Sequence, residues 1–113
     1  MSDCLFCKII AGEIPSTKVY EDEWVYAFLD IDPQAPFHAV IVPKIHIASA
    51  AEINAENSHY VSKIFEAVAK IAAQEKLEDG FRVVNNCGKD GGQTVGHIHF
   101  HLLARRYLQW PPG

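Results

Sequence analysis

Three of the six histidines, His97, His99 and His101, alternate with apolar residues near the end of the chain. Successive side chains of a strand point to opposite faces, so this spacing places all three imidazoles on one face. Such a row can supply metal ligands, or a nucleophile that attacks phosphorus or a carbonyl carbon. A solvated polar face is the plain alternative, but clustered titratable groups beside a glycine-rich loop favour a functional site. The residue after each histidine is predicted to face the core: Ile98, Phe100 and Leu102.

The segment before this row, residues 86–94, holds three of the seven glycines and is predicted to be a loop. Its backbone N–H groups can approach an anion closely. Gln93 and Thr94 add a side-chain amide and a hydroxyl. A plain glycine-rich hairpin is the alternative. Because the histidine row begins three residues after Thr94, the combination favours phosphate chemistry.

The elements that must position these groups are predicted from turn residues and from hydrophobic periodicity. A short helix over residues 3–10, capped by Asp3 and ended by Gly12, opens the chain. A long helix over residues 58–76, capped by Asn57 or Ser58, shows apolar residues at helical spacing. Several strands with one long helix between them indicate an α+β fold on an antiparallel sheet. The predicted strands are residues 19–20, 24–29, 37–42, 81–85 and 96–104.

Composition limits the remaining possibilities. The chain has 113 residues, 49% of them hydrophobic, and a net charge of −4. It is predicted to be a single domain over residues 1–113 with one core, and not a disordered or disulfide-dense chain. No large basic face is expected, so nucleic acid is an improbable partner. No apolar stretch approaches the length of a membrane span, and the N-terminus lacks the charge order of a secretory signal. We expect a cytoplasmic protein whose three cysteines stay reduced.

The heptad His97–Leu103 resembles the His-φ-His-φ-His-φ-φ motif, with φ apolar, of the histidine triad (HIT) nucleotide hydrolases and transferases. The wider match is to the HINT branch of that family, the purine nucleoside phosphoramidases, and it spans residues 6–113. The other matching segments are Phe28–Ile31, Pro33–Pro36, His38, Pro43-Lys44, Asn86, Asp90–Gln93 and Trp110–Gly113.

The resemblance implies a HIT fold, with a five-stranded antiparallel sheet, one long helix and one short helix. It implies a homodimer whose two sheets join into ten strands. The implied reaction is hydrolysis of the P–N bond of purine nucleoside 5′-phosphoramidates, such as adenylated amines or lysine, without an organic cofactor. A dinucleoside polyphosphate hydrolase of the same family and a nucleotide-binding adaptor are the alternatives.

The resemblance also implies roles for single residues. His99 matches the nucleophile, which forms a nucleotidyl-histidine intermediate that water then hydrolyses. His101 matches a histidine that contacts phosphate oxygens, and His97 matches one close to the nucleophile. Thr94 stands where relatives often carry Ser, near the leaving group. Gln93, with neighbouring N–H groups, would hold phosphate oxygens.

The resemblance also implies which residues contact the nucleoside and the leaving group. Asp30 matches the carboxylate that accepts both ribose hydroxyls, although a turn-capping Asp is the alternative. His38 matches a histidine behind the site, although a hydrogen-bonded structural histidine is the alternative. Asn86 matches a residue near the phosphate and the leaving group, and Trp110 matches a side chain directed at the partner's active site. The apolar cleft for the base would comprise Phe6, Ile9, Phe28, Leu29 and Ile31, some of which could equally be core.

Cys4 and Cys7 are three residues apart, so they share a face of a short helix. Many microbial HIT proteins resemble this chain in pairing such cysteines with two histidines, which here are His46 and His97. The resemblance implies a structural zinc site closed to substrate. A metal on His97 is expected to leave His99 unaffected. Two buried thiols in the base cleft are the alternative.

Overall fold

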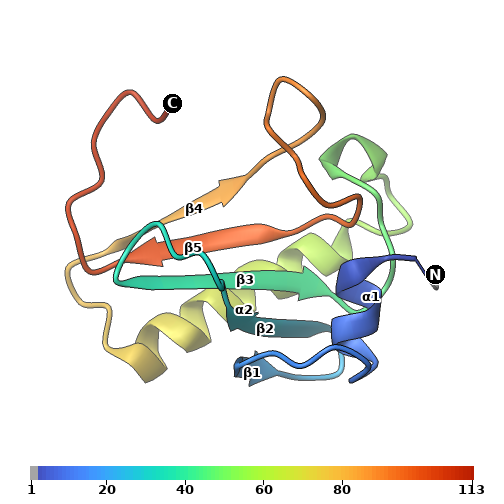
Figure 1. Ribbon diagram of the computed structural model, residues 1–113, viewed down its shortest axis with the longest axis horizontal. Coiled ribbons are helices and arrows are strands. Elements are labelled where there is room, and N and C mark those ends of the chain that lie inside the picture. Colours follow the sequence, from blue (N-terminus) through green and yellow to red (C-terminus); the bar gives the residue numbers. More distant parts are fainter. Residues whose placement is uncertain (1–2) are drawn as a thin grey trace.

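The structure is a computed structural model that describes residues 3–113; residues 1 and 2 of the predicted domain lie outside this range. Within it, five antiparallel strands form one sheet in the order β1-β2-β3-β5-β4 (Figure 1). The predicted α+β fold, with one long and one short helix, is confirmed. Among the described residues, no helix is long and apolar enough to cross a bilayer. The elements are α1 Leu5–Ile10, β1 Lys18–Glu21, β2 Val25–Leu29, β3 Phe37–Pro43, the 3₁₀ turn η1 Ala50–Glu52, α2 His59–Glu75, β4 Phe81–Asn85 and β5 Phe100–Ala104.

β3 lies in the middle of the sheet, and each of its seven residues is buried. Its near-continuous apolar sequence is typical of a strand that is covered on both faces. Ala39 and Ile41 belong to the larger core cluster beneath α2. Val40 and Val42 belong to a smaller cluster beneath α1. The two helices therefore cover opposite faces of the same strand (Figure 1).

The predicted long helix is confirmed with both ends shifted inward by one residue. Its buried stripe packs against the sheet. Ser58 occupies the N-cap position, but its side chain makes no capping hydrogen bond. At the other end Lys76 adopts a left-handed conformation with φ 57°, and its N–H donates to the last carbonyls of the helix. The buried residues of the stripe are Ile64, Ala67, Val68 and Ile71.

The short helix differs from its prediction at the N-terminus. Cys4, and not Asp3, is the N-cap, because the Cys4 sulfur accepts a hydrogen bond from the Cys7 N–H at 3.3 Å. Gly12, with φ +80°, follows the last turn as expected. The capping sulfur was missed because sulfur is a weak acceptor that is rarely assigned this role.

The last strand begins at Phe100 and not at Gly96. Phe100 pairs with Ile41 on one side and Asn85 on the other, and both ladders stop there. Residues 96–99 join no strand ladder, and the chain bends at Gly96 and His97. The predicted core positions are confirmed, since the side chain after each histidine lies in the core under α2: Ile98, Phe100 and Leu102.

Candidate active site

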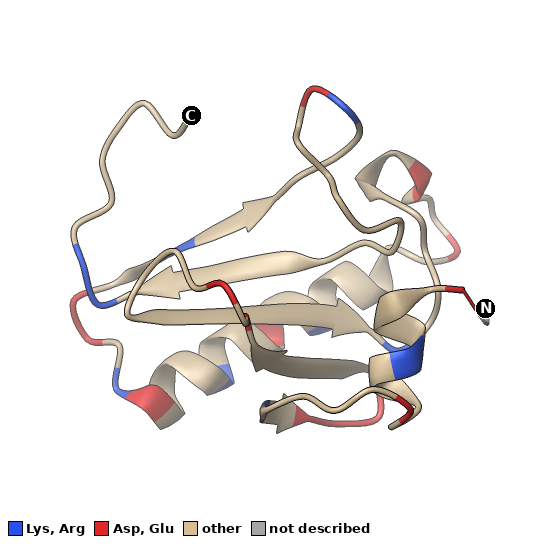
Figure 2. Ribbon diagram, viewed as in Figure 1, with Lys and Arg blue, Asp and Glu red and all other residues tan. Residues whose placement is uncertain are grey.

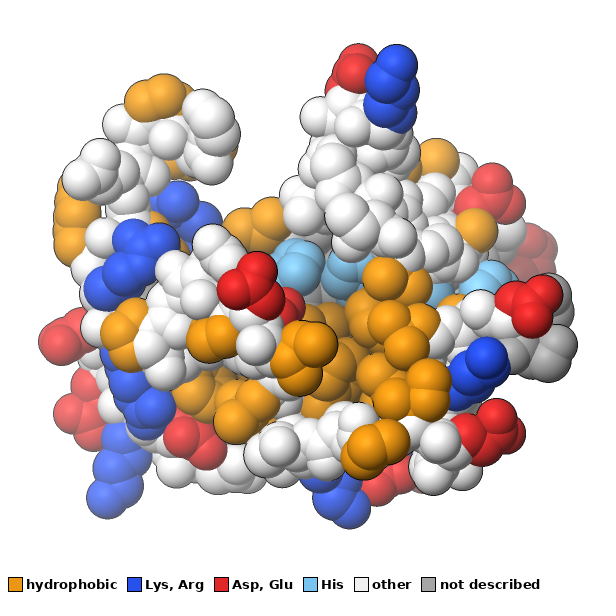
Figure 3. Space-filling model, in the orientation of Figure 1, with side chains coloured by type: hydrophobic (Ala, Val, Ile, Leu, Met, Phe, Trp, Pro, Cys, Tyr) orange, Lys and Arg blue, Asp and Glu red, His pale blue; other side chains and the backbone are white. Residues whose placement is uncertain are grey.

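A cleft of about 350 Å³ lies between α1, the end of β2 and the segment that leads into β5. Figure 3 shows its apolar floor bordered by histidine side chains beneath the projecting loop. The central strands β3 and β5 carry no charged residue (Figure 2). Among the predicted site residues, the cleft brings together Asp30, Thr94, His99 and His101 with the apolar set Phe6, Ile9, Phe28, Leu29 and Ile31.

His99 is held in one tautomer by the backbone. Its Nδ1 lies 2.8 Å from the carbonyl oxygen of His97. A carbonyl can only accept, so Nδ1–H is the donor and Nε2 carries the lone pair. His99 is 4% exposed, and its ring packs nearly perpendicular to the ring of Phe6, with 5.0 Å between the centroids. Since His99 lines the cleft, its free nitrogen is available there as a nucleophile or a ligand.

His101 is fixed in the opposite tautomer by a chain of hydrogen bonds. The Gln34 N–H donates to His38 Nδ1 at 3.0 Å. His38 must then carry its proton on Nε2, which donates to His101 Nδ1 at 2.8 Å. His101 therefore presents Nε2–H as a donor, and it lines the cleft. The Asp30 carboxylate lies 3.5 Å from the same His38 Nε2 that donates to His101.

His101 is neutral at neutral pH. Burial, followed by the nearby His99 and His38, lowers the pKa of His101 from 6.5 to about 4. Burial also lowers the pKa of His38. No Lys or Arg is among the described residues that line the cleft. An anion in the cleft would thus be met by neutral donors whose direction is fixed by tautomer.

Asp30, His38 and His101 also place their ligand atoms within 4.8 Å of one another. The 2.8 Å between the two ring nitrogens is a hydrogen-bond distance. It is shorter than the roughly 3.3 Å between two nitrogen ligands of tetrahedral zinc, which follows from Zn–N lengths near 2.0–2.1 Å. The three residues form a hydrogen-bonded relay.

The glycine-rich loop is braced from within by Gln93. Its Nε2 donates to the carbonyls of Ala48 and Val95 at 2.8 and 2.9 Å. Its Oε1 accepts from the Gly88 N–H at 2.9 Å. Gln93 is not among the residues that line the cleft, whereas the adjacent Thr94 is. The amide that we expected to hold phosphate is instead fully bonded to the backbone, and it fixes where Thr94 lies.

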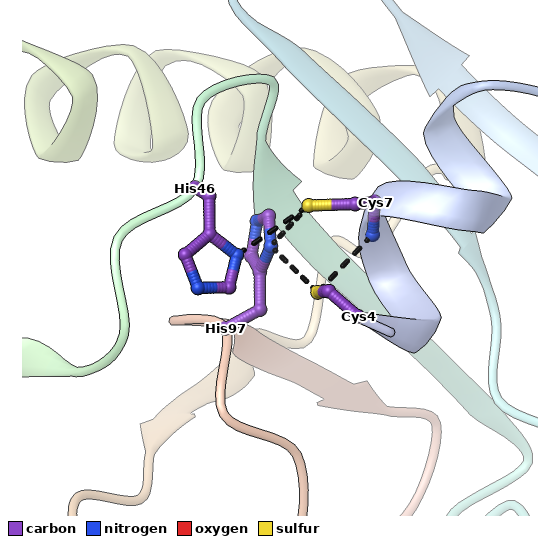
Figure 4. A group of neighbouring side chains, drawn as sticks. All are labelled: Cys4, Cys7, His46 and His97. Atoms are coloured by element: carbon purple, nitrogen blue, oxygen red, sulfur yellow. Dashed lines mark hydrogen bonds between the residues drawn. The ribbon is translucent and has the colours of Figure 1, made fainter. Parts of the chain in front are cut away.

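A second group of side chains that could bind a ligand comprises Cys4, Cys7, His46 and His97 (Figure 4). His97 is fully buried. Its Nε2–H donates to the Pro43 carbonyl at 3.1 Å, so Nδ1 carries the lone pair. Nδ1 lies 3.4 Å from the Cys4 sulfur and 3.5 Å from the Cys7 sulfur. His46 Nδ1 lies 3.4 Å from the Cys7 sulfur. Burial lowers the pKa of His97 to about 4 and raises that of the Cys7 thiol.

These four side chains fit a tetrahedral zinc ion. Their ligand atoms all lie within 4.8 Å of one another. Zn–S bonds near 2.3 Å and Zn–N bonds near 2.0–2.1 Å place tetrahedral S and N ligands about 3.6 Å apart, close to the separations found here. Two thiols and two neutral imidazoles are also a common donor set for structural zinc.

Asn86 and Trp110 are two more predicted site residues that lie outside the cleft of the single chain. Asn86 is half-buried and lines a different hollow, together with Arg82 and Val84 of β4. Trp110 is 77% exposed, with its ring 5.8 Å from the Arg82 guanidinium carbon. Neither side chain meets His99 within one chain.

One residue that the sequence analysis missed is Asn85. Its side-chain amide donates to the carbonyl of His99 at 2.9 Å, just past the last residue pair of the β4–β5 ladder. The sequence Asn85-Asn86 offered two neighbouring amides, and nothing in the spacing distinguished them. The cleft residues that were missed are Leu5, Ile14, Pro15, Ser16, Val40 and Val95.

Comparison with known proteins places this geometry in context. The model of the HIT domain matches residues 11–108. A 14 kDa zinc-binding protein from Zea mays is 52% identical over 99% of this chain and 89% of its own length. A purine nucleoside phosphoramidase from Escherichia coli is 47% identical over 94% of this chain and 90% of its own. The crystal structure of a HIT family hydrolase from Legionella pneumophila superposes with a TM-score of 0.95, at 50% identity, and covers 98% of this chain and 100% of that one.

Proposed function

This chain belongs to the HIT family and is a nucleotide hydrolase, and from that premise we propose that it cleaves the P–N bond of purine nucleoside 5′-phosphoramidates. One observation carries the proposal. His99 donates Nδ1–H to the His97 carbonyl and keeps the lone pair of Nε2 in a cleft that also holds His101, Thr94 and Asp30. The Escherichia coli relative, named a purine nucleoside phosphoramidase, supports the same reaction.

The reaction takes two steps in this geometry. The Nε2 lone pair of His99 forms a bond to phosphorus as the P–N bond breaks, and the amine leaves with the bonding electrons and takes a proton from solvent. The Thr94 hydroxyl, in the cleft wall, hydrogen-bonds the departing amine. Water then attacks phosphorus and gives up a proton to solvent, the bond to His99 breaks, and the lone pair returns to Nε2. The product is the nucleoside monophosphate.

The surrounding groups act on the transition state and on the nucleoside. His101 directs Nε2–H at the phosphoryl oxygens, where negative charge develops, and the His38 relay keeps it in that tautomer. Asp30 accepts from the ribose hydroxyls. Its Oδ1 already accepts from the Asp32 N–H at 2.8 Å, which fixes the carboxylate in place. The purine lies against the apolar set that includes Phe6 and Phe28.

The proposal includes a structural zinc ion held by Cys4, Cys7, His46 and His97. Its support is the separation of the four ligand atoms, the tautomer of His97 and the similarity to a plant zinc-binding protein. When bound, zinc supplies structural cross-linking, since four protein ligands leave no open position for substrate. A reducing, cytoplasmic compartment suits this centre, because zinc needs both sulfurs as thiolates.

A homodimer through the edge of the sheet is also part of the proposal. β4 has one neighbour, β5, so its other edge can pair with a second copy and extend the sheet to ten strands. Phe81 on β4 and Phe65 on α2 are 44% and 49% exposed, which is typical of an apolar interface. In such a dimer the exposed Trp110 can reach the partner's cleft.

Release of AMP from adenosine 5′-phosphoramidate by the wild type and by His99→Asn tests the reaction. We expect the variant to lose about 10³-fold or more in turnover while still binding AMP. Faster turnover of diadenosine polyphosphates than of the phosphoramidate would favour the other hydrolase reaction. Tight AMP binding with no turnover of either substrate would favour the adaptor function.

A further inference from the structure

His97 takes part in both clusters, through different atoms. Its side chain points Nδ1 at the thiols of Cys4 and Cys7, and its Nε2–H is bonded to the Pro43 carbonyl. Its backbone carbonyl accepts the Nδ1–H of His99 at 2.8 Å. The carbonyl that orients the nucleophile therefore belongs to a residue whose ring is fixed by the metal ligands. The two histidines are not independent.

Helix α1 also takes part in both clusters. It carries Cys7 and is capped by Cys4. Between them Phe6 packs nearly perpendicular to the rings of His97 and His99, with centroids 6.0 and 5.0 Å apart. Phe6 and Ile9 are buried in the wall of the cleft. A helix of six residues is well below the roughly 12–15 residues needed for stability in isolation. Its position must come from packing and from its thiols.

A third connection runs to the glycine-rich loop. Cys4 and His46 line a shared hollow with Thr94, Val95 and Gly96, the residues that lead from the loop to His97. The metal ligands thus lie beside the segment that sets the position of the Thr94 hydroxyl. Helix α1, the loop end and the nucleophile all meet at the Cys₂His₂ cluster.

We propose that the Cys4, Cys7, His46 and His97 centre is a positioning device for the reaction: a bound Zn²⁺ fixes α1 against residues 97–99 and so sets both the purine-side wall of the cleft and the orientation of His99. The inference rests on the proposed function, in which these residues hold zinc and His99 is the nucleophile. The four ligands act through Phe6 and the His97 carbonyl and touch no substrate.

The test compares the full chain loaded with Zn²⁺ and the same chain stripped by a chelator. Three quantities are measured: the dissociation constant for AMP by calorimetry, hydrogen exchange of the amides of residues 5–10, and kcat and KM for adenosine 5′-phosphoramidate. Removing zinc is expected to weaken AMP binding about tenfold and to speed exchange in α1 by at least about tenfold, since second-sphere support is worth 10–100-fold elsewhere. A misplaced His99 is expected to lower kcat about 10²-fold.

His46→Ala is the matched variant, because His46 is exposed, lies after β3 and joins no wall of the AMP cleft. It should lose zinc and reproduce the stripped wild type. His46→Cys restores a four-ligand set and should rescue AMP affinity and α1 protection. His59→Ala, at another exposed histidine, is the control and should match the wild type.

Stoichiometric zinc with unchanged AMP affinity and α1 exchange after stripping would overturn the inference and leave the proposed function standing. No stoichiometric zinc in the wild type would overturn both the zinc site and the inference. Metal-dependent AMP binding without AMP release from the phosphoramidate would support the positioning role and refute the proposed reaction.

Discussion

His97 and His99 stand two residues apart and share one face, yet the structure prepares them for opposite tasks. The His97 ring donates Nε2–H to the Pro43 carbonyl and turns the Nδ1 lone pair toward two thiols. The His99 ring donates Nδ1–H to the His97 carbonyl and turns the Nε2 lone pair toward the cleft. In each case the backbone carbonyl that accepts the ring N–H determines which ring nitrogen keeps its lone pair. The tautomer, and not the residue type, separates a metal ligand from a nucleophile.

Loss of the His99 nucleophile is expected to have the largest effect, and it should change activity without changing the Cys/His cluster at His97. In His99→Asn we expect turnover to fall by about 10³-fold or more while zinc content stays at the wild-type value. Rapid-quench assays and elemental analysis on the same sample measure both. Loss of zinc together with activity would show that the two regions cannot be separated at this position.

A second large effect is expected in the glycine-rich loop that leads to Thr94 in the cleft wall. In Gly91→Ala the new Cβ would lie 2.5 Å from the Cys87 carbonyl oxygen, so the loop must shift. Misplacing Thr94 by about 1 Å is expected to cost about 10²-fold in kcat. Gly96→Ala meets nothing within 4 Å and is the control for steady-state kinetics. Equal activity of the two variants would argue against a role for the loop.

The ribose side of the cleft should respond in KM. Asp30→Asn keeps the shape of the side chain but replaces an acceptor oxygen by a donor group. We expect KM for adenosine 5′-phosphoramidate to rise about tenfold, because one charge-assisted hydrogen bond is lost. The change in kcat should be smaller. The same substitution should not alter zinc content. An unchanged KM would remove Asp30 from the nucleoside contacts.

The pH dependence of stability reports on the relay behind the cleft. His101 has a pKa of about 4 in the folded chain and an ordinary value of 6.5. Between these values the unfolded chain binds a proton that the folded chain does not, so the free energy of unfolding decreases as pH falls from 6.5 to 4. In His101→Asn this decrease should be smaller. Urea denaturation at several pH values measures it, and identical slopes for both proteins would contradict the assigned pKa.

The smallest effect is expected at Asn85, which donates to the His99 carbonyl at 2.9 Å. Asn85→Ala should lower the free energy of unfolding by about 1 kcal/mol, the net value of one hydrogen bond. Asn86→Ala, at the adjacent residue, is the control. Equal loss of stability in both variants, measured by thermal denaturation, would mean that the bond to His99 contributes nothing of its own.

Much of this architecture follows from local patterns in the chain. The stripe of α2 and the alternation of Ile98, Phe100 and Leu102 predict which faces are buried, because periodicity reports burial directly. The late start of β5 at Phe100 was missed, since it depends on where β4 ends and on where the pairing with β3 stops. The Cys4 cap was missed as well. These features arise from contacts between distant segments.

The site also has features that the sequence predicts and features that it does not. Spacing and family resemblance placed His99, His101, Thr94 and Asp30 in one cleft, and Cys4 with His97 in one cluster. No pattern in the sequence indicates that Gln93 bonds to Ala48, or that His38 sets the tautomer of His101. Hydrogen-bond direction depends on three-dimensional neighbours 45 and 63 residues away.

The most direct test is nitrogen-15 NMR of the histidine side chains at neutral pH, which assigns the protonated nitrogen of each ring. The account predicts Nδ1–H on His99 and Nε2–H on His101, with His97 protonated on Nε2 in the zinc-loaded chain. His99→Asn and His101→Asn assign the signals. Protonation of His99 on Nε2 would leave no lone pair for phosphorus in the cleft and would contradict the central claim.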